Sequence, residues 1–122
     1  MNTANELTIV IPAKNEAKLI PRLLTSLTTQ DYTKMSSTRV LVADANSTDG
    51  TPEIVLGFRD RLNVSVIRGG RPSVGRNQGA AQADSSYVLF LDADVELADR
   101  SLLRRCARRP AARFSLMITR RY

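Results

Sequence analysis

Residues 87–94, Tyr87-Val88-Leu89-Phe90-Leu91-Asp92-Ala93-Asp94, decide the fold that this sequence predicts. The first five residues form a short, uninterrupted apolar run, which is typical of a strand buried on both faces. The two carboxylates behind it stand two positions apart, so they point to the same side as the chain leaves the sheet. Ligands of open α/β sheets bind at this carboxyl end of the strands.

Two carboxylates this close repel each other unless a cation lies between or beside them. Mg²⁺ or Mn²⁺ is the usual cation, and phosphate oxygens then complete its coordination. Taken alone, Asp92-Ala93-Asp94 is more often a solvated acidic turn. The rest of the chain has to decide between these two interpretations.

Apolar runs and amphipathic stretches alternate along the whole chain. Strands are expected at 7–11, 40–43, 64–67 and 87–91, with a further one at 114–119, and a loop is expected at 30–38. Helices are expected from about Leu19 to Leu27, from Thr51 (as N-cap) to Phe58, at 73–83 and at 97–109. This order predicts a mostly parallel α/β sheet, joined by right-handed crossovers, with helices on both faces in three layers.

Composition limits the chemistry that is available. A chain of 122 residues is long enough for one domain with one core. Histidine is absent and Cys106 is the single cysteine, which excludes histidine catalysis, an internal disulfide and a multi-cysteine zinc site. Acid–base or metal chemistry must therefore use carboxylates. No apolar stretch approaches the roughly 20 residues that span a bilayer, and no signal-peptide pattern opens the chain, so we expect a cytoplasmic protein.

The net charge of +6 is concentrated at one end of the sequence. Residues 1–99 carry a net charge of −2, whereas residues 100–122 carry eight arginines and no acid. Clustered arginines attract anionic lipid headgroups or nucleic acid, but aromatic residues do not interleave with them before Phe114, so we expect no nucleic-acid partner. A solvated helix face and a contact with anionic lipid are the two interpretations of this segment.

The loops behind three predicted strands should meet at one edge of the sheet. They span 12–16, 44–49 and 92–94, and the segment 71–77 runs along the same edge. Arg71 and Arg76 offer guanidinium groups for phosphate, and the carboxylates offer ligands for a metal and for ribose hydroxyls. The combination suits a nucleoside diphosphate held by a divalent cation. Each part also has a structural interpretation, as a turn, a helix cap or a surface ion pair.

Two common nucleotide-binding motifs are absent. The segment 68–71, Arg-Gly-Gly-Arg, does not match the phosphate-binding loop of ATPases, and no G-x-G-x-x-G follows the first strand. These absences argue against an ATPase and against a dinucleotide-binding enzyme.

Four segments resemble, in order and spacing, the N-terminal half of family 2 glycosyltransferases, which have the Rossmann-like GT-A fold. The segments are Leu7–Glu16, Val42–Thr51, Gly75–Ala80 and Leu89–Asp94, and the resemblance covers about residues 7–104. It implies an inverting transferase that moves a sugar from a UDP- or GDP-linked donor to an acceptor hydroxyl. It also implies Mg²⁺ or Mn²⁺ as cofactor, with Asp94 the more direct metal ligand and Asp92 beside it.

The donor-binding residues expected from the loops and the resemblance come from four segments of the chain. They are Pro12, Ala13, Asn15, Glu16, Asp44, Asn46, Ser47, Arg71, Arg76, Asn77 and Asp92. Many family members carry a second acid where this chain has Ala45, so the choice of base is left open.

The family's general base and acceptor pocket lie in a later half that nothing after Leu97 matches. We therefore expect a donor-binding domain at 1–104, an Arg-rich segment at 105–122 that starts a missing acceptor half, and a catalytic base beyond the chain end. The acceptor is expected to be lipid-linked or a saccharide, with the basic end at the inner face of the membrane. The alternatives are a non-catalytic nucleotide-sugar-binding or partner-docking module, and a nucleotidyltransferase, whose usual Gly-rich loop is absent.

Overall fold

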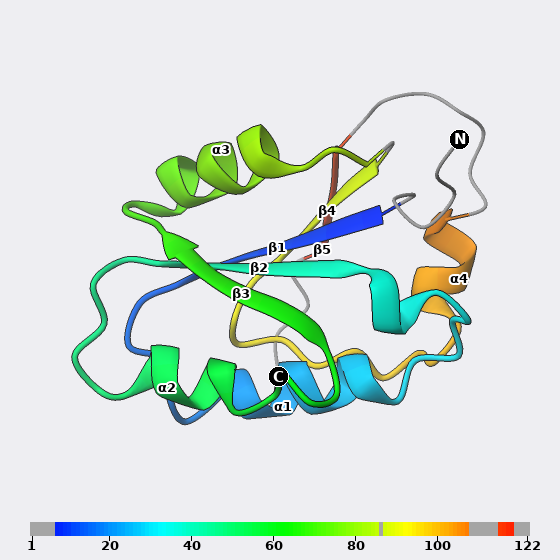
Figure 1. Cartoon of the computed structure of the whole chain (residues 1–122), viewed down its shortest axis with the longest axis horizontal. Helices are drawn as coiled ribbons and strands as arrows, with labels where there is room; N and C mark the ends of the chain where they lie inside the picture. Colours follow the sequence, from blue (N-terminus) through cyan, green and yellow to red (C-terminus); the bar gives the residue numbers. More distant parts are fainter. Residues whose placement is uncertain (1–6, 86, 108–114, 119–122) are drawn as a thin grey trace.

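The computed structural model describes residues 7–85, 87–107 and 115–118 (Figure 1). Helices and strands alternate through most of this length. The strands are β1 (Leu7–Ala13), β2 (Arg39–Asp44), β3 (Asn63–Arg68), β4 (Tyr87–Leu91) and β5 (Ser115–Ile118). The helices are α1 (Ile20–Thr28), the short 3₁₀ helix η2 (Met35–Ser37), α2 (Thr51–Leu56), α3 (Pro72–Gln82) and α4 (Leu102–Ala107).

The described strands form a five-stranded sheet in the order β3-β2-β1-β4-β5. Every pair is parallel, and Ile9 of β1 lies opposite Val40 of β2 on one side and Leu89 of β4 on the other. The carboxyl ends of the strands therefore meet at one edge, as the alternating pattern predicts.

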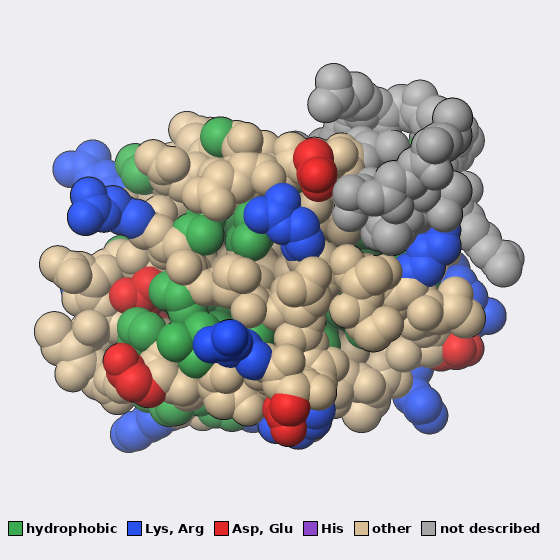
Figure 2. Space-filling view, viewed as in Figure 1, with side chains coloured by type: hydrophobic (Ala, Val, Ile, Leu, Met, Phe, Trp, Pro, Cys, Tyr) green, Lys and Arg blue, Asp and Glu red, His purple; other side chains and the backbone are tan. Residues whose placement is uncertain are grey.

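Helices cover both faces of the sheet, which confirms the three-layer α/β arrangement. In Figure 1, α3 lies on one face, and α1 and α2 lie on the other. The apolar stripe of α1, from Ile20 to Leu27, is buried against the core. Figure 2 shows acidic and basic side chains interspersed over this view, with apolar side chains visible between α3 and α2.

Glycines bring α3 unusually close to the sheet. A Cβ on Gly79 would lie 2.3 Å from a methyl carbon of Val10, and one on Gly75 would lie 3.2 Å from Cβ of Pro12. Larger side chains at these positions would push the helix away from β1. The small residues of α3 thus allow the helix to pack closely on the sheet.

Two predicted helix boundaries are wrong. Gly50, with φ 89°, caps α2 in place of Thr51, because glycine adopts this left-handed conformation without strain. The helix expected to begin at 97 begins at Leu102, as α4. Residues 97–101 are not helical because their N–H groups donate to side chains: Leu97 donates to Ser26 Oγ, and Ser101 donates to Asp99. The expected loop at 30–38 contains η2.

Residues 108–114 and 119–122 lie outside the described residues, so the predicted end of the helix at 109 and the ends of the strand at 114 and 119 fall there. Within the described part of the chain, no helix is both long and apolar enough to cross a bilayer.

Three of the C-terminal arginines are bound to the domain. Arg104 pairs with Asp31 at 3.7 Å, and Arg105 pairs with Asp99. Arg100 Nε donates to the carbonyl of Thr29 at 3.0 Å. The contacts of Arg100 and Arg104 hold the start of α4 against the residues that follow α1, and the Arg105–Asp99 pair joins α4 to the segment before it.

Candidate functional site

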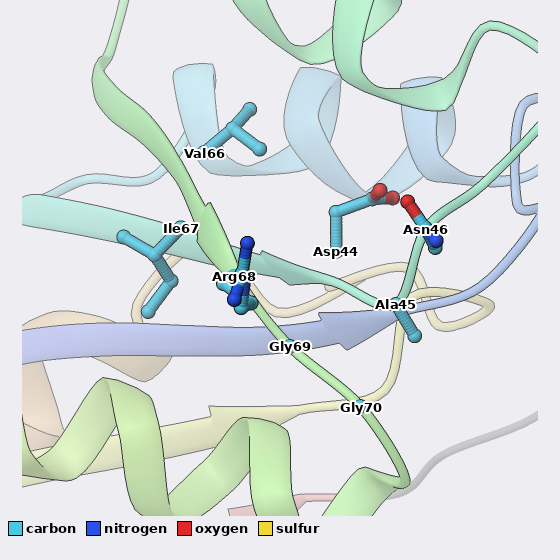
Figure 3. Close-up of a pocket in the computed structure, with 8 residues that line it drawn as sticks. All are labelled: Asp44, Ala45, Asn46, Val66, Ile67, Arg68, Gly69 and Gly70. Atoms are coloured by element: carbon cyan, nitrogen blue, oxygen red, sulfur yellow. The ribbon is translucent and has the colours of Figure 1, made fainter.

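Two pockets lie next to each other at the carboxyl edge of the sheet. Figure 3 shows the first, which we call the β2–β3 pocket. Its volume is about 480 Å³. It is lined by Asp44, Ala45, Asn46, Val66, Ile67, Arg68, Gly69 and Gly70. The second, the Asp92–Asp94 pocket, has a volume of about 210 Å³ and is lined by Pro12, Ala13, Lys14, Glu16, Gly70, Pro72, Asp92, Ala93 and Asp94. Gly70 lines both, so the two pockets adjoin.

The floor of the β2–β3 pocket depends on a glycine. The Gly69 N–H donates to the Asp44 carbonyl at 2.8 Å. A Cβ at Gly69 would lie 2.5 Å from the Ala43 carbonyl oxygen, which is backbone and cannot rotate away. Only glycine therefore lets the chain leave β3 this close to β2.

Asp44 shapes the rim of the same pocket. Its two carboxylate oxygens accept from the Ser47 N–H at 3.0 Å and from the Ser47 hydroxyl at 2.6 Å. These bonds close the turn after β2, in which Asn46 has a left-handed φ of 62°. Each carboxylate oxygen can accept more than one bond, so Asp44 keeps capacity for a ligand.

A set of hydrogen bonds, which we call the loop clasp, joins residues 14–17 behind β1 to residues 44–51 behind β2. The Asn15 N–H donates to Ser47 Oγ at 2.8 Å, and Asn15 Oδ1 accepts from the Thr48 N–H at 2.8 Å. Lys14 Nζ donates to the carbonyls of Ala45 and Asn46 at 2.9 and 3.0 Å. The two loops thus form one bonded unit.

Thr51 and Asp49 close the other end of the clasp. Thr51 is fully buried, and its hydroxyl accepts from the Glu16 N–H at 3.0 Å and donates to Asp49. Asp49 also accepts from the N–H groups of Ala17 and Thr51. The Thr51 hydroxyl, followed by these N–H groups, lowers the pKa of Asp49 below its usual 3.8.

The Asp92–Asp94 turn is anchored by apolar residues. Ala93 is 2% exposed and Val95 is 0% exposed, and the Val95 N–H donates to the Asp92 carbonyl at 3.2 Å. Both carboxylate side chains line the pocket named after them, in agreement with their spacing in the sequence. Oδ1 of Asp94 is buried and accepts no hydrogen bond, although the residue has other interactions.

The donor set of this pocket fits a metal that shares its coordination with a ligand. Among the described residues, no group of three or more His, Cys, Asp or Glu side chains could hold a metal ion. Mg²⁺ is usually bound by one or two carboxylates plus water and substrate phosphates. Asp92 and Asp94 supply that number of carboxylates.

The structure distributes the predicted site residues over three places. Pro12, Ala13, Glu16, Asp92 and Asp94 line the Asp92–Asp94 pocket, Asp44 and Asn46 line the β2–β3 pocket, and Asn15 and Ser47 belong to the clasp. Arg71 is the N-cap of α3, and Arg76 and Asn77 lie within the helix. All three are outside the lining of both pockets, and their role stays a prediction.

The predicted site residues leave out several that build the site, among them Lys14, Arg68, Gly69 and Gly70. Lys14 stands inside the motif behind the first strand, and the glycine pair follows the third strand directly, so their positions in the sequence were the available signal. The backbone approach that requires Gly69 exists only in the folded sheet.

The family described as Glycosyl transferase family 2 matches residues 8–121 of this chain. Solved structures of Staphylococcus aureus TarS are similar to it. The TarS 1–349 complex with UDP has a TM-score of 0.76 at 33% identity, covering 84% of this chain and 31% of that chain. The complex with UDP-GlcNAc has a TM-score of 0.75 at 35% identity, with 84% and 30% coverage.

Curated relatives give the same indication. Poly(ribitol-phosphate) beta-N-acetylglucosaminyltransferase TarS of S. aureus is 39% identical over 90 residues, 70% of this chain and 16% of the relative. Validoxylamine A glucosyltransferase of Streptomyces hygroscopicus is 37% identical over 93 residues, 73% of this chain and 22% of the relative. The chain thus spans less than a quarter of these relatives.

Proposed function

The chain belongs to glycosyl transferase family 2, and on this premise we propose that it binds the nucleotide-sugar donor of a metal-dependent, inverting glycosyl transfer. The observation that carries the proposal is the pair of adjoining pockets, one bounded by Asp44 and Asn46 and the other by Asp92 and Asp94. A nucleoside diphosphate needs two such subsites, one for the nucleoside and one for the charged diphosphate.

We assign the nucleoside to the β2–β3 pocket and the diphosphate to the Asp92–Asp94 pocket. Asp44 and Asn46 offer acceptor and donor atoms to the nucleoside. Pro12, Ala13 and Glu16 line the diphosphate side. The TarS structures solved with UDP and UDP-GlcNAc favour a uridine diphosphate sugar over a guanosine one.

Asp94, with Asp92, would hold Mg²⁺ or Mn²⁺ against the diphosphate. When bound there, the cation supplies Lewis-acid neutralisation of the charge that develops on the leaving group. Arg71 and Arg76 would add positive charge from the start of α3. No residue of this chain is proposed as the general base.

We also propose that residues 1–104 form the donor-binding unit and that residues 105–122 lead into the part that receives the acceptor. A saccharide or a lipid-linked molecule would suit such an acceptor site. Because the chain spans a small part of its relatives, a non-catalytic nucleotide-sugar-binding module is the second candidate.

The test is thermal unfolding of the chain against UDP, GDP and UDP-GlcNAc, with Mn²⁺ and with EDTA. A ligand at 100 times its Kd should stabilise the chain by about 2.7 kcal/mol. We expect UDP with Mn²⁺ to raise Tm and EDTA to reverse most of the increase. Asp94→Ala should lose the metal-dependent part, and Asp60→Ala, an exposed acid before β3, should keep it.

If no nucleotide changes Tm, the proposed donor site is wrong. If UDP binds equally well with EDTA, the metal assignment alone fails. Hydrolysis of UDP-GlcNAc by the isolated chain would exclude the non-catalytic alternative.

A further inference from the structure

Lys14 lies where the two pockets meet. Its side chain lines the Asp92–Asp94 pocket. Its Nζ donates to the carbonyls of Ala45 and Asn46 at 2.9 and 3.0 Å, and these two residues line the β2–β3 pocket. Lys14 is thus the one described lysine that contacts both walls of the proposed donor cleft.

Lys14 donates to two backbone carbonyls with one ammonium group. Ala45 and Asn46 are consecutive, and Asn46 has a left-handed φ of 62°, so both carbonyl oxygens approach the same ammonium group. The negative ends of two converging carbonyl dipoles repel each other without a donor between them. An ammonium group has three donors and can satisfy both carbonyls.

We propose that Lys14 is a positioning residue for nucleoside recognition: it holds residues 45–48 in the conformation that receives the base and ribose. The inference rests on the proposed function for the identity of the ligand, but the effect of Lys14 on the conformation of residues 45–48 can be tested without ligand. Asn15 and Ser47 fix the backbone of the same loops, and Lys14 binds the carbonyls of Ala45 and Asn46.

A positioning role has a distinct signature. If loss of the Lys14 ammonium group leaves the loop in its binding conformation for only a fraction of the time, the apparent Kd rises by the inverse of that fraction. That factor is the same for every ligand that uses the nucleoside pocket. A direct phosphate contact would instead weaken UDP more than uridine, which has no phosphate.

The experiment compares Lys14→Met, Lys14→Arg and the matched control Lys18→Met, an exposed lysine outside both pockets. Calorimetry gives the Kd of uridine and UDP, and amide hydrogen exchange without ligand gives the protection of the Ser47 and Thr48 N–H groups. We expect K14M to raise both Kd values by a similar factor of about 3 to 10 and to speed exchange at both amides. K14R, which keeps the charge and donors, should restore most of the wild-type affinity and most of the amide protection.

A Kd increase that is larger for UDP than for uridine would make Lys14 a phosphate ligand and overturn the proposal. Unchanged binding and exchange in K14M would also overturn it, as would equal effects in K18M. If the wild type binds no nucleotide, the donor proposal fails, and the exchange experiment alone decides the role of Lys14. Faster exchange in K14M then supports the proposal that Lys14 holds residues 45–48, and unchanged exchange overturns it. If K14M does not fold, the same comparison is made with Lys14→Gln.

Discussion

The loop clasp and the Asp92–Asp94 turn lie at the same edge of the sheet and both contain a pair of aspartates, yet they are held differently. Asp44 and Asp49 accept hydrogen bonds from their own loops. The Asp92–Asp94 turn is anchored by buried Ala93 and Val95, and its carboxylates line a pocket. In the clasp, aspartate carboxylates bind the loop, and Asp44 lines the β2–β3 pocket as well. At the Asp92–Asp94 turn, buried apolar neighbours anchor the backbone and the aspartates line the second pocket.

The largest expected effect comes from changing a carboxylate of the Asp92–Asp94 turn. Asp94→Asn removes a charge that would hold the metal, and we expect the Mn²⁺-dependent affinity for UDP to fall by about 100-fold, the upper end for loss of a supporting partner at a metal site. Asp44→Asn should instead lower Tm and weaken UDP binding equally with Mn²⁺ and with EDTA. Calorimetry under both conditions distinguishes the two. Equal metal dependence in both variants would contradict the comparison.

The next largest effect comes from removing a hydrogen-bonding group of the loop clasp. Thr51→Val removes the buried hydroxyl that accepts from Glu16 and donates to Asp49. The unsatisfied Glu16 N–H should cost about 1–3 kcal/mol of unfolding free energy, measured by urea denaturation. Thr51→Ser, which keeps the hydroxyl, should retain most of the stability. If Val and Ser behave alike, the hydroxyl does not hold the clasp.

A third variant asks whether a loss of stability alone can imitate either effect. Gly79→Ala places a Cβ against Val10, far from both loops in the chain. We expect a net loss of about 1 kcal/mol, because overpacking costs about 1–3 kcal/mol and alanine regains about 1 kcal/mol of helix propensity. Urea denaturation measures the loss, and Gln78→Ala on the same helix is the control. The metal dependence of UDP binding should not change; a change would show that it follows general stability.

The smallest expected effect is a pH dependence. The pKa of Asp49 is lowered chiefly by the Thr51 hydroxyl, so its carboxylate favours the folded state above the usual value of 3.8. This stabilisation is lost as the pH falls from 3.8 through the lowered pKa. Asp49→Asn should be less stable than the wild type at pH 7 and should flatten the loss of stability below pH 4.

Asp99 provides the control for the pH experiment. Its pKa is also lowered, mainly by the Ser101 hydroxyl and N–H and then by Arg105. Asp99→Asn should flatten the same acid limb without changing amide exchange in the clasp, whereas Asp49→Asn should speed that exchange. Thermal melts between pH 2.5 and 7, at steps of about half a unit, give both curves; an unchanged acid limb in Asp49→Asn would contradict the assignment.

The strand and helix order followed from local patterns and was predictable. Tyr87–Leu91 was located to the residue, and the other strands within a few residues, because continuous apolar runs identify strands buried on both faces. The family was predictable as well, because four motifs kept their order and spacing. The cap of α2 was not, since glycine and threonine both occur at N-caps and a left-handed φ decides between them.

The sequence by itself determined the parallel α/β fold, the family, and which loops would meet at the carboxyl edge. Only the tertiary structure decided what each polar residue at that edge does. Asp44 and Asp94 are chemically identical in the sequence and both line a pocket, but Asp44 also accepts two hydrogen bonds from Ser47 that close the turn after β2. Lys14 donates to the carbonyls of Ala45 and Asn46, which lie about 30 residues further along the chain. Hydrogen bonds depend on distance and angle between groups that the fold brings together, and no local pattern contains that geometry.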